Sequence, residues 1–261
     1  MKTLVIKKKN PLVAFLNETG EIARFTVQFF NYWFRPVYET KEFFKQCFLI
    51  GNLSLPLIGL TGFIMGLVLT MQLRPTMVDY GVASQIPAIV GISIIREIGP
   101  VISALIFAGK IGSSIGAELG SMKVTEQIDA MEVSGTNPFK YLVVTRVMAC
   151  TLMLPVLSIL SDFISLGGAF IGVNIKGNTS FHLFWTQVID ALSFNDVLPA
   201  FFKTYVFGFA VGMIGCYKGY HCKKGTVGVG KSANSSVVVA SVLIFIIDLI
   251  VVQITDLLGY N

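Results

Sequence analysis

Five long stretches of apolar residues dominate the hydrophobic pattern of this chain. They cover residues 47–69, 86–108, 142–173, 198–217 and 237–258. Each is about 20 residues or longer, and an α-helix needs roughly 20 apolar residues to cross the hydrocarbon core of a bilayer. Because backbone groups in lipid must satisfy one another, runs this continuous indicate helices and not barrel strands. The pattern predicts an all-α integral membrane protein with five transmembrane helices.

A polar stripe at helical spacing precedes the first apolar stretch. Its members recur at steps of three or four residues: Glu21, Arg24, Gln28, Asn31 and Arg35. The residues between them are mainly aromatic and aliphatic, as is typical of a helix lying in the membrane interface; packing against a soluble partner is the alternative. We expect a cytoplasmic N-terminus and interfacial helix over residues 1–44, followed by a five-span domain over residues 45–261.

Basic residues are unevenly distributed between the two sides of this topology. Sixteen of the 20 Lys and Arg residues precede the first stretch or lie in or beside the second and fourth connections. By the positive-inside rule this side is cytoplasmic, with the C-terminus outside. The composition, 54% hydrophobic and 13% charged, agrees with a membrane protein. Since the net charge of +5 comes from the membrane flanks, nucleic acid is a poor candidate partner.

The second connection is patterned as a short amphipathic helix over about residues 123–134. Its apolar positions share one face: Val124, Ile128 and Met131. Its other positions are acidic or amide: Glu126, Gln127, Asp129 and Glu132. The anionic cytoplasmic leaflet would repel these carboxylates, which favours docking into a soluble partner over resting on lipid headgroups.

Ionisable residues inside the apolar stretches mark a second candidate region. Arg96 and Glu97 stand in the second stretch and Asp248 in the fifth. Such residues are costly in lipid and are expected to face protein or a wet cavity. Neighbouring residues differ by about 100° around a helix, so Arg96 and Glu97 cannot simply face one another. They either anchor neighbouring helices or line the polar zone of a transport path, and Asp248 is expected to face the bundle interior.

Small residues one turn apart predict close contacts between the spans. Gly62 and Gly66 form such a pair in the first stretch, and Gly208 and Gly212 form another in the fourth. Glycine at this spacing lets two helix backbones approach closely.

Two motifs resemble a nucleotide-binding loop and a zinc site, but their sequence context does not support either function. Residues 225–232 satisfy the phosphate-loop pattern GxxxxGK[ST], but that loop works at a strand-to-helix junction, and here it joins two spans. We expect a basic cytoplasmic turn there and no ATP binding. Cys216, His221 and Cys222 fit no standard zinc spacing, so no metal site is predicted. No HExxH or similar catalytic pairing occurs, which argues against an intramembrane enzyme.

Several segments match a known family closely. They are residues 96–100 (REIGP), 108–112 (AGKIG), 117–133 (AELGSMKVTEQIDAMEV) and 225–232 followed by 237–241 (VVVAS). On these segments the chain resembles the MlaE/YrbE-type permeases, the membrane subunits of MCE-associated ABC transporters. The resemblance covers about residues 40–258. Lys110 departs from the family pattern, which more often has Arg there.

The resemblance implies partners and cargo. It implies a homodimer in the bacterial inner membrane, a cytoplasmic ATPase that carries ATP and magnesium, an extracytoplasmic MCE-domain protein, and phospholipid or a related lipid as cargo. A passive membrane scaffold or channel with no ATPase is the alternative, and it leaves the acidic helix unexplained.

The resemblance also implies roles for individual residues. The ATPase-coupling residues would be Glu118, Thr125, Glu126, Gln127, Asp129, Met131 and Glu132. Arg96 and Glu97 would lie in the polar part of a lipid cavity. The apolar lining of that cavity would include Leu67, Met71 and Leu243.

Overall fold

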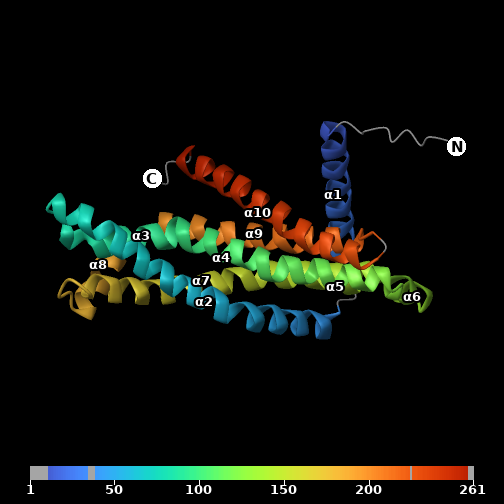
Figure 1. The fold of residues 1–261 in the computed structure, drawn as a ribbon, viewed down its shortest axis with the longest axis horizontal. Helices are drawn as coiled ribbons and strands as arrows, with labels where there is room; N and C mark the ends of the chain where they lie inside the picture. Colours follow the sequence, from blue (N-terminus) through green and yellow to red (C-terminus); the bar gives the residue numbers. More distant parts are fainter. Residues whose placement is uncertain (1–10, 35–38, 224, 258–261) are drawn as a thin grey trace. The chain divides into compact units, whose positions relative to one another are not determined.

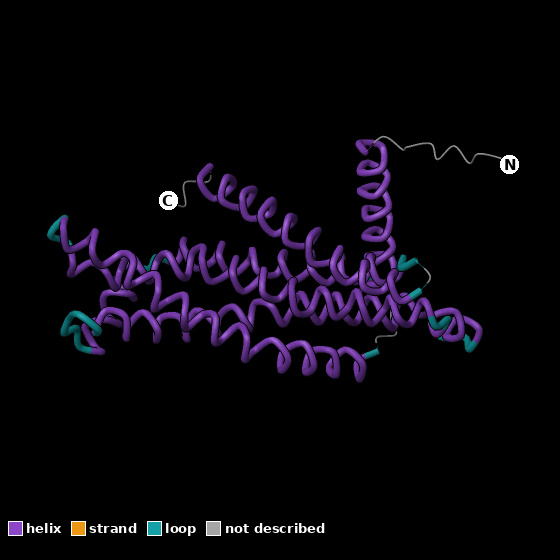
Figure 2. Tube along the Cα trace, viewed as in Figure 1, coloured by secondary structure: helices purple, strands orange, loops and turns teal. Residues whose placement is uncertain are grey.

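The computed structural model of the chain describes residues 11–34, 39–223 and 225–257. It forms two compact units, Met1–Tyr38 and Glu39–Asn261. Every regular element in the described residues is helical, which confirms the predicted all-α class (Figure 2).

The first unit contains helix α1 (Pro11–Trp33). Four positions of the predicted polar stripe lie on it, and Arg35 lies outside the described residues. The rings of Phe29 and Phe30 are 5.4 Å apart, and those of Phe30 and Trp33 are 6.3 Å apart. These edge-on contacts line one side of the helix with aromatic carbon, a pattern suited to an interface between lipid and water.

The second unit contains five helical segments that are long and apolar enough to cross a membrane, as predicted: Thr40–Asp79, Ala83–Val124, Phe139–Asn174, Phe194–Tyr220 and Thr226–Leu257. Three of them are single helices, namely α2 (Thr40–Asp79), α9 (Phe194–Tyr220) and α10 (Thr226–Leu257) (Figure 1). Each segment is longer than the apolar stretch that predicted it, because polar turns extend its ends.

The second segment is built from six consecutive pieces. They are η1 (Ala83–Gln85), α3 (Ile86–Ser93), η2 (Ile94–Ile98), α4 (Gly99–Phe107), η3 (Ala108–Gly112) and α5 (Ser113–Val124). Both η2 and η3 are π-helical. A π-helical turn inserts an extra residue into the ladder and rotates the side chains that follow, and such turns are frequent at functional sites.

The third segment joins a π-helical start, η4 (Phe139–Val144), to α7 (Thr145–Asn174). Two short helices occupy connections: α6 (Gln127–Val133) follows α5, and α8 (Phe181–Ala191) precedes α9. Helix α8 was not predicted. Its N-terminus is capped by Ser180, whose hydroxyl accepts a hydrogen bond from the Leu183 amide at 3.2 Å.

The predicted glycine pairs lie at close helix contacts. A Cβ atom on Gly66 of α2 would overlap the carbonyl oxygen of Ser165 on α7. A Cβ on Gly208 of α9 would lie 2.5 Å from the carbonyl oxygen of Cys150, also on α7. Helix α7 therefore packs backbone to backbone against two neighbours, which fixes the register of three spans.

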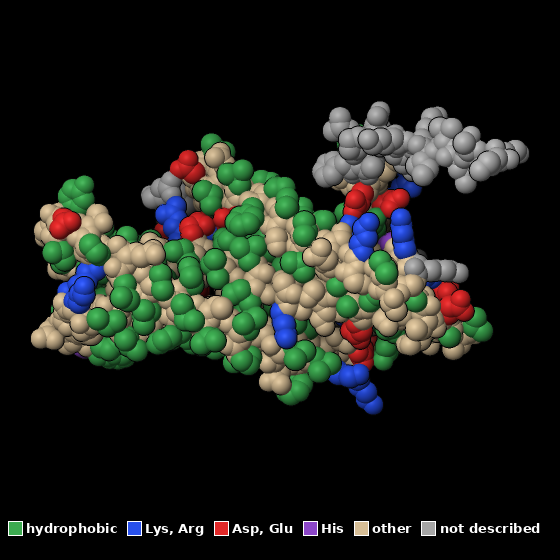
Figure 3. All heavy atoms as spheres, viewed as in Figure 1, with side chains coloured by type: hydrophobic (Ala, Val, Ile, Leu, Met, Phe, Trp, Pro, Cys, Tyr) green, Lys and Arg blue, Asp and Glu red, His purple; other side chains and the backbone are tan. Residues whose placement is uncertain are grey.

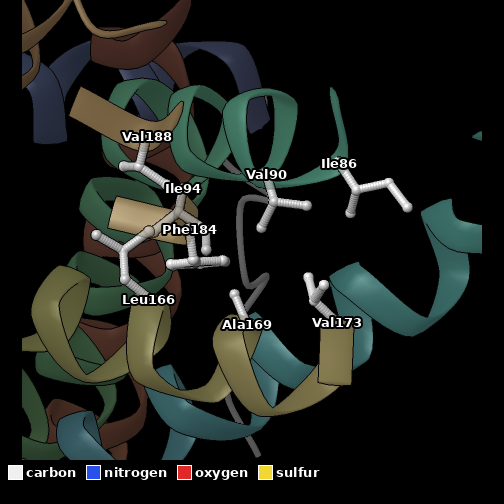
Figure 4. Close-up of a cluster of buried hydrophobic side chains, with 8 residues drawn as sticks. All are labelled: Ile86, Val90, Ile94, Leu166, Ala169, Val173, Phe184 and Val188. Carbon is white, nitrogen blue, oxygen red and sulfur yellow. The ribbon is translucent and has the colours of Figure 1, made fainter. Parts of the chain in front are cut away.

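A compact apolar cluster holds α3, α7 and α8 together (Figure 4). Its members come from all three elements and from the first residue of η2: Ile86, Val90, Ile94, Leu166, Ala169, Val173, Phe184 and Val188. The Phe184 ring lies 5.4 Å from that of Phe170 and is fully buried. This cluster anchors the beginning of η2, and so it orients the two charged residues that follow.

Hydrophobic side chains are spread widely over the visible surface (Figure 3). Large apolar residues on α2 and α10 are exposed, among them Phe48, Leu60, Val242, Phe245 and Leu249. Water disfavours so much apolar surface, and a surface of this kind is stable against lipid or an apolar partner. The second unit therefore has the exterior of a membrane protein.

Candidate functional site

A buried lysine joins three of the membrane spans. Lys203 of α9 has a side chain that is 2% exposed. Its Nζ lies 2.7 Å from Glu97 Oε2 in η2 and 3.0 Å from Asp248 Oδ1 in α10. A buried ammonium group is tolerated only with charged or hydrogen-bonding partners, and here two carboxylates provide them. The structure thus confirms that Asp248 faces the bundle interior and identifies its partner.

Arg96, the neighbour of Glu97, has a different partner. Its Nη1 lies 3.4 Å from Asp196 Oδ1 in the first turn of α9. Asp196 in turn accepts hydrogen bonds from the Ser193 hydroxyl at 2.6 Å and from the Ser193 amide at 3.1 Å. The bond from the Ser193 amide is one half of a capping box, and the bond from the hydroxyl holds the same carboxylate oxygen. Arg96 and Glu97 therefore reach separate partners, as their angular separation on a helix predicts.

The ion pairs around Lys203 and Arg96 form a charged cluster with more carboxylates than cations. The carboxylates are those of Glu97, Asp196 and Asp248, and the cations are Arg96 and Lys203. When all five are ionised, the cluster has one excess negative charge. The side chains of Arg96 and Glu97 are 34% and 39% exposed, whereas Lys203 is enclosed. The exposed side of the cluster thus presents one cation and one anion next to each other.

The cavity at this charged cluster is small. It measures about 20 Å³ and is bordered by Arg96, Glu97, Asp196 and Lys203. That volume holds about one water molecule. A lipid headgroup does not fit inside it, so contact with a headgroup would have to occur at the exposed edge formed by Arg96 and Glu97.

The sequence alone assigned no role to three residues of this region: Lys203, Asp196 and Asp162. Asp162 of α7 lies against Gly99, where a Cβ atom would overlap its Oδ1, and this oxygen has no hydrogen-bond partner among the described residues. The position of Lys203 within an apolar stretch was a usable signal, because a charge at that depth requires a partner.

The predicted coupling helix is shorter than its sequence pattern indicated. Instead of spanning residues 123–134 continuously, the chain ends α5 at Val124 and begins α6 at Gln127. Glu126 separates the two helices because its φ of 60° lies in the left-handed region. A residue in the left-handed region cannot continue a right-handed helix, and residues other than glycine rarely adopt it.

The predicted coupling residues are mostly exposed, as docking requires. Glu126, Gln127, Asp129 and Glu132 are exposed, and Thr125 is exposed while its hydroxyl donates to the Ser121 carbonyl at 2.9 Å. Met131 is half-buried. Ile128 is fully buried, which anchors α6 to the unit. An ion pair of 2.7 Å between Lys123 Nζ and Asp129 Oδ1 also ties α6 to α5.

Glu118 is engaged within the fold. Its Oε1 lies 2.7 Å from Arg146 Nη2, and the Arg146 side chain is 3% exposed. Arg146 also donates to the Leu142 carbonyl at 3.1 Å. Glu118 therefore connects α5 to α7, while about half of its own surface remains exposed.

The predicted apolar lining is divided between two sides of the unit. Leu67 and Met71 lie on α2, which packs along α7, whereas Leu243 lies on α10, which packs along α9 and α5. Met71 borders a hollow of about 380 Å³ with Arg74 and Lys176. The packing of the helices therefore separates Leu243 from Leu67 and Met71.

The phosphate-loop pattern has no phosphate-loop geometry. From Thr226 onward its residues form the first turns of α10. Ser232 is buried, and its hydroxyl donates to the Gly116 carbonyl at 3.2 Å. In the part of the chain that the structure describes, no three His, Cys, Asp or Glu side chains are grouped to hold a metal ion.

Comparison with known proteins places the chain in a family. The family described as Permease MlaE matches residues 43–254. The chain is 35% identical over 212 residues to the Intermembrane phospholipid transport system permease protein MlaE of Haemophilus influenzae, covering 80% of this chain and 81% of that protein. It is 36% identical over 242 residues to a probable ABC transporter permease protein of Rickettsia typhi, covering 92% and 93%. These matches confirm the resemblance found in the sequence, and the chain belongs to the MlaE family of ABC transporter permeases.

Proposed function

We propose that this permease moves phospholipid between the inner membrane and an extracytoplasmic MCE-domain protein, as a homodimer driven by a separate ATPase. The likeness to the phospholipid permease of Haemophilus influenzae, over four fifths of both chains, is the observation that carries the proposal. As an ABC permease the chain is a non-catalytic, multi-pass membrane subunit and works with a partner ATPase. We further propose that its cargo is phospholipid, that it forms a homodimer and that it meets an MCE-domain protein.

The orientation we propose places α6 in the cytoplasm. The excess of Lys and Arg in the same connections supports this side. The exposed carboxylates of Glu126, Asp129 and Glu132 then project from the membrane toward the ATPase. An anionic leaflet repels such a surface, whereas a basic groove on a protein partner attracts it.

Motion of α6 has a continuous route to the charged cluster. Ile128 and the Lys123–Asp129 ion pair fix α6 to α5, and α5 continues through η3 and α4 to η2. Helices bend most readily at π-helical turns. ATP-driven movement at α6 would thus reach Glu97, and through it Lys203 and α10, by bending at η3 and η2.

The lipid would meet the exposed edge of the charged cluster. Arg96 offers a cation for a phosphate, and Glu97 offers an anion for a headgroup ammonium, which together match a zwitterionic headgroup. Acyl chains would lie against the apolar faces that carry Leu67, Met71 and Leu243. Because one subunit keeps these faces apart, the lipid cavity in this proposal is completed by the second subunit.

ATP-dependent lipid transfer in a reconstituted system tests this function. Vesicles carrying the permease, its ATPase and a fluorescent phospholipid would be mixed with the soluble MCE-domain protein. The expected result is transfer that requires hydrolysable ATP and stops with a non-hydrolysable analogue. Equal transfer with both nucleotides would instead identify a passive channel or scaffold and overturn the proposal.

A further inference from the structure

A basic pocket lies where α9 ends and α10 begins, away from the charged cluster. It has a volume of about 390 Å³, and its border includes Lys218, Lys223, Lys231 and His221. None of its described lining residues is acidic. Along α9, Lys218 stands 15 residues after Lys203, or about 22 Å at the rise of an α-helix. The pocket is thus separate from the proposed lipid path.

The walls of this basic pocket are held by specific contacts. The His221 amide donates to the Tyr217 carbonyl at 3.1 Å, and the Cys222 amide donates to the Gly219 carbonyl at 3.1 Å. Gly225 has a φ of +96°, which favours glycine and turns the chain into α10. On the far side, the hydrogen bond from Ser232 to Gly116 fastens α10 to α5. Lys218 and Lys231 therefore stand on two packed helices, and Lys223 follows the first of them.

The electrostatics of the basic pocket favour an anion. Lys223 and Lys231 are exposed, so their ammonium groups are free to reach a ligand at the membrane surface. The first turn of α10 also borders the pocket through Val227 and Gly228. The positive end of the α10 helix dipole therefore lies at the pocket. Burial raises the pKa of the half-buried Cys222 thiol above its usual range, so this side chain adds no negative charge near neutral pH.

We propose that this basic pocket binds a phosphate group, carried either by an anionic phospholipid headgroup or by free inorganic phosphate. Three ammonium groups around a cavity of this size suit a tetrahedral oxyanion, and basic pockets between membrane helices recognise anionic headgroups in this way. Such a ligand stays bound at the permease and is not the transported cargo. Its binding does not depend on which lipid is moved.

The test measures lipid association with the full-length permease in nanodiscs. The discs contain phosphatidylcholine and a minor fraction of spin-labelled phosphatidylglycerol, and the motionally restricted signal reports bound lipid. A variant with the three pocket lysines replaced is compared with the wild type: Lys218→Gln, Lys223→Gln and Lys231→Gln. We expect its relative association constant for phosphatidylglycerol to fall about tenfold, since each lysine near an anionic surface contributes to attraction.

A matched control separates the pocket from general surface charge. It replaces three exposed lysines outside the pocket, with the same loss of charge: Lys41→Gln, Lys45→Gln and Lys110→Gln. The control should retain most of the association. Equal losses in both variants, or no loss in either, would overturn the proposal. A third variant with arginine at the three pocket positions keeps the charge and should retain binding, and an unchanged thermal unfolding midpoint of the glutamine variant excludes misfolding as the cause of a loss.

Competition with inorganic phosphate identifies the source of the phosphate. Lipid association that resists this competitor supports an anionic headgroup as the ligand. Displacement of the labelled lipid by inorganic phosphate supports a free phosphate ion. Because no transport is measured, failure of this experiment is distinguishable from failure of the proposed lipid transfer.

Discussion

The Nζ of Lys203 lies 2.7 Å from Oε2 of Glu97, across 106 residues of sequence. This contact joins α9 to the π-helical turn η2, and the second carboxylate, Asp248, adds α10. Since the lysine is almost fully enclosed, the three spans cannot separate without leaving a charge unpaired in a membrane. The contact thus gives the spans a definite relative position at the point where the second span is irregular.

Removal of the buried cation alone should destabilise the permease. Lys203→Met leaves Glu97 and Asp248 facing one another without a counterion, and breaking a buried pair on one side costs about 3 kcal/mol or more. We expect a clear fall in the thermal unfolding midpoint of the detergent-solubilised protein.

The control for this change removes all three charges together, as Lys203→Met with Glu97→Gln and Asp248→Asn. With no unpaired charge left, the triple variant should recover most of the lost stability. A triple variant that is as unstable as the single one would mean that the lysine stem, and not its charge, holds the spans.

The coupling role of α6 is tested by reversing one exposed charge. Glu126→Lys leaves the buried anchor Ile128 in place but inverts the surface offered to the ATPase. We expect normal membrane insertion, loss of co-purification with the ATPase, and loss of ATP-dependent lipid transfer. Glu39→Lys, an exposed acidic residue at the start of the second unit, is the matched control and should behave as the wild type.

The left-handed backbone conformation of Glu126 leads to a separate prediction about stability. A side chain at φ of 60° is disfavoured by about 1 kcal/mol relative to glycine. Glu126→Gly should therefore raise the unfolding midpoint slightly while weakening ATPase binding through loss of the carboxylate. Gly135→Ala should lower the unfolding midpoint, because Gly135 has a φ of +79° that alanine disfavours. A Glu126→Gly variant that is less stable than the wild type would contradict this account.

Much of the fold could be predicted because its causes are local in sequence. The five apolar stretches require helices in lipid, and glycines one turn apart allow those helices to touch. The separate directions of Arg96 and Glu97 follow from helical geometry alone. Even the exposed acidic face of α6 follows from its residue pattern.

The remainder depends on packing that no local pattern records. The pairing of Lys203 with Glu97 needs the relative positions of two spans far apart in the chain. The π-helical turns η2 and η3 are shifts of hydrogen-bond register, and the residue types in them do not distinguish them from an ordinary helix. The coupling helix was predicted too long because a glutamate in the left-handed region gives no signal in the sequence, unlike glycine.

The contact between α2 and α7 can be tested with one glycine at the contact and one outside it. A Cβ atom at Gly66 would overlap the Ser165 carbonyl oxygen, whereas one at Gly167 of α7 meets nothing within 4 Å. Gly66→Ala should destabilise the permease by about 1–3 kcal/mol, since helix backbones cannot shift without cost. Gly167→Ala should be neutral or slightly stabilising because alanine favours a helix. Thermal unfolding in detergent measures both, and equal effects would refute the predicted backbone contact.

The role proposed for Arg96 is separable from its ion pair with Asp196. That pair is long, at 3.4 Å, and partly exposed, so its loss should cost less than about 1 kcal/mol. Arg96→Gln removes the cation offered to a phosphate, and we expect slower lipid transfer by the assembled complex with an almost unchanged unfolding midpoint. Asp196→Asn breaks the same ion pair but leaves the guanidinium in place and keeps an oxygen for the Ser193 cap. If Arg96 acts on the lipid, only Arg96→Gln slows transfer; if it serves to hold α9, the two variants slow transfer equally.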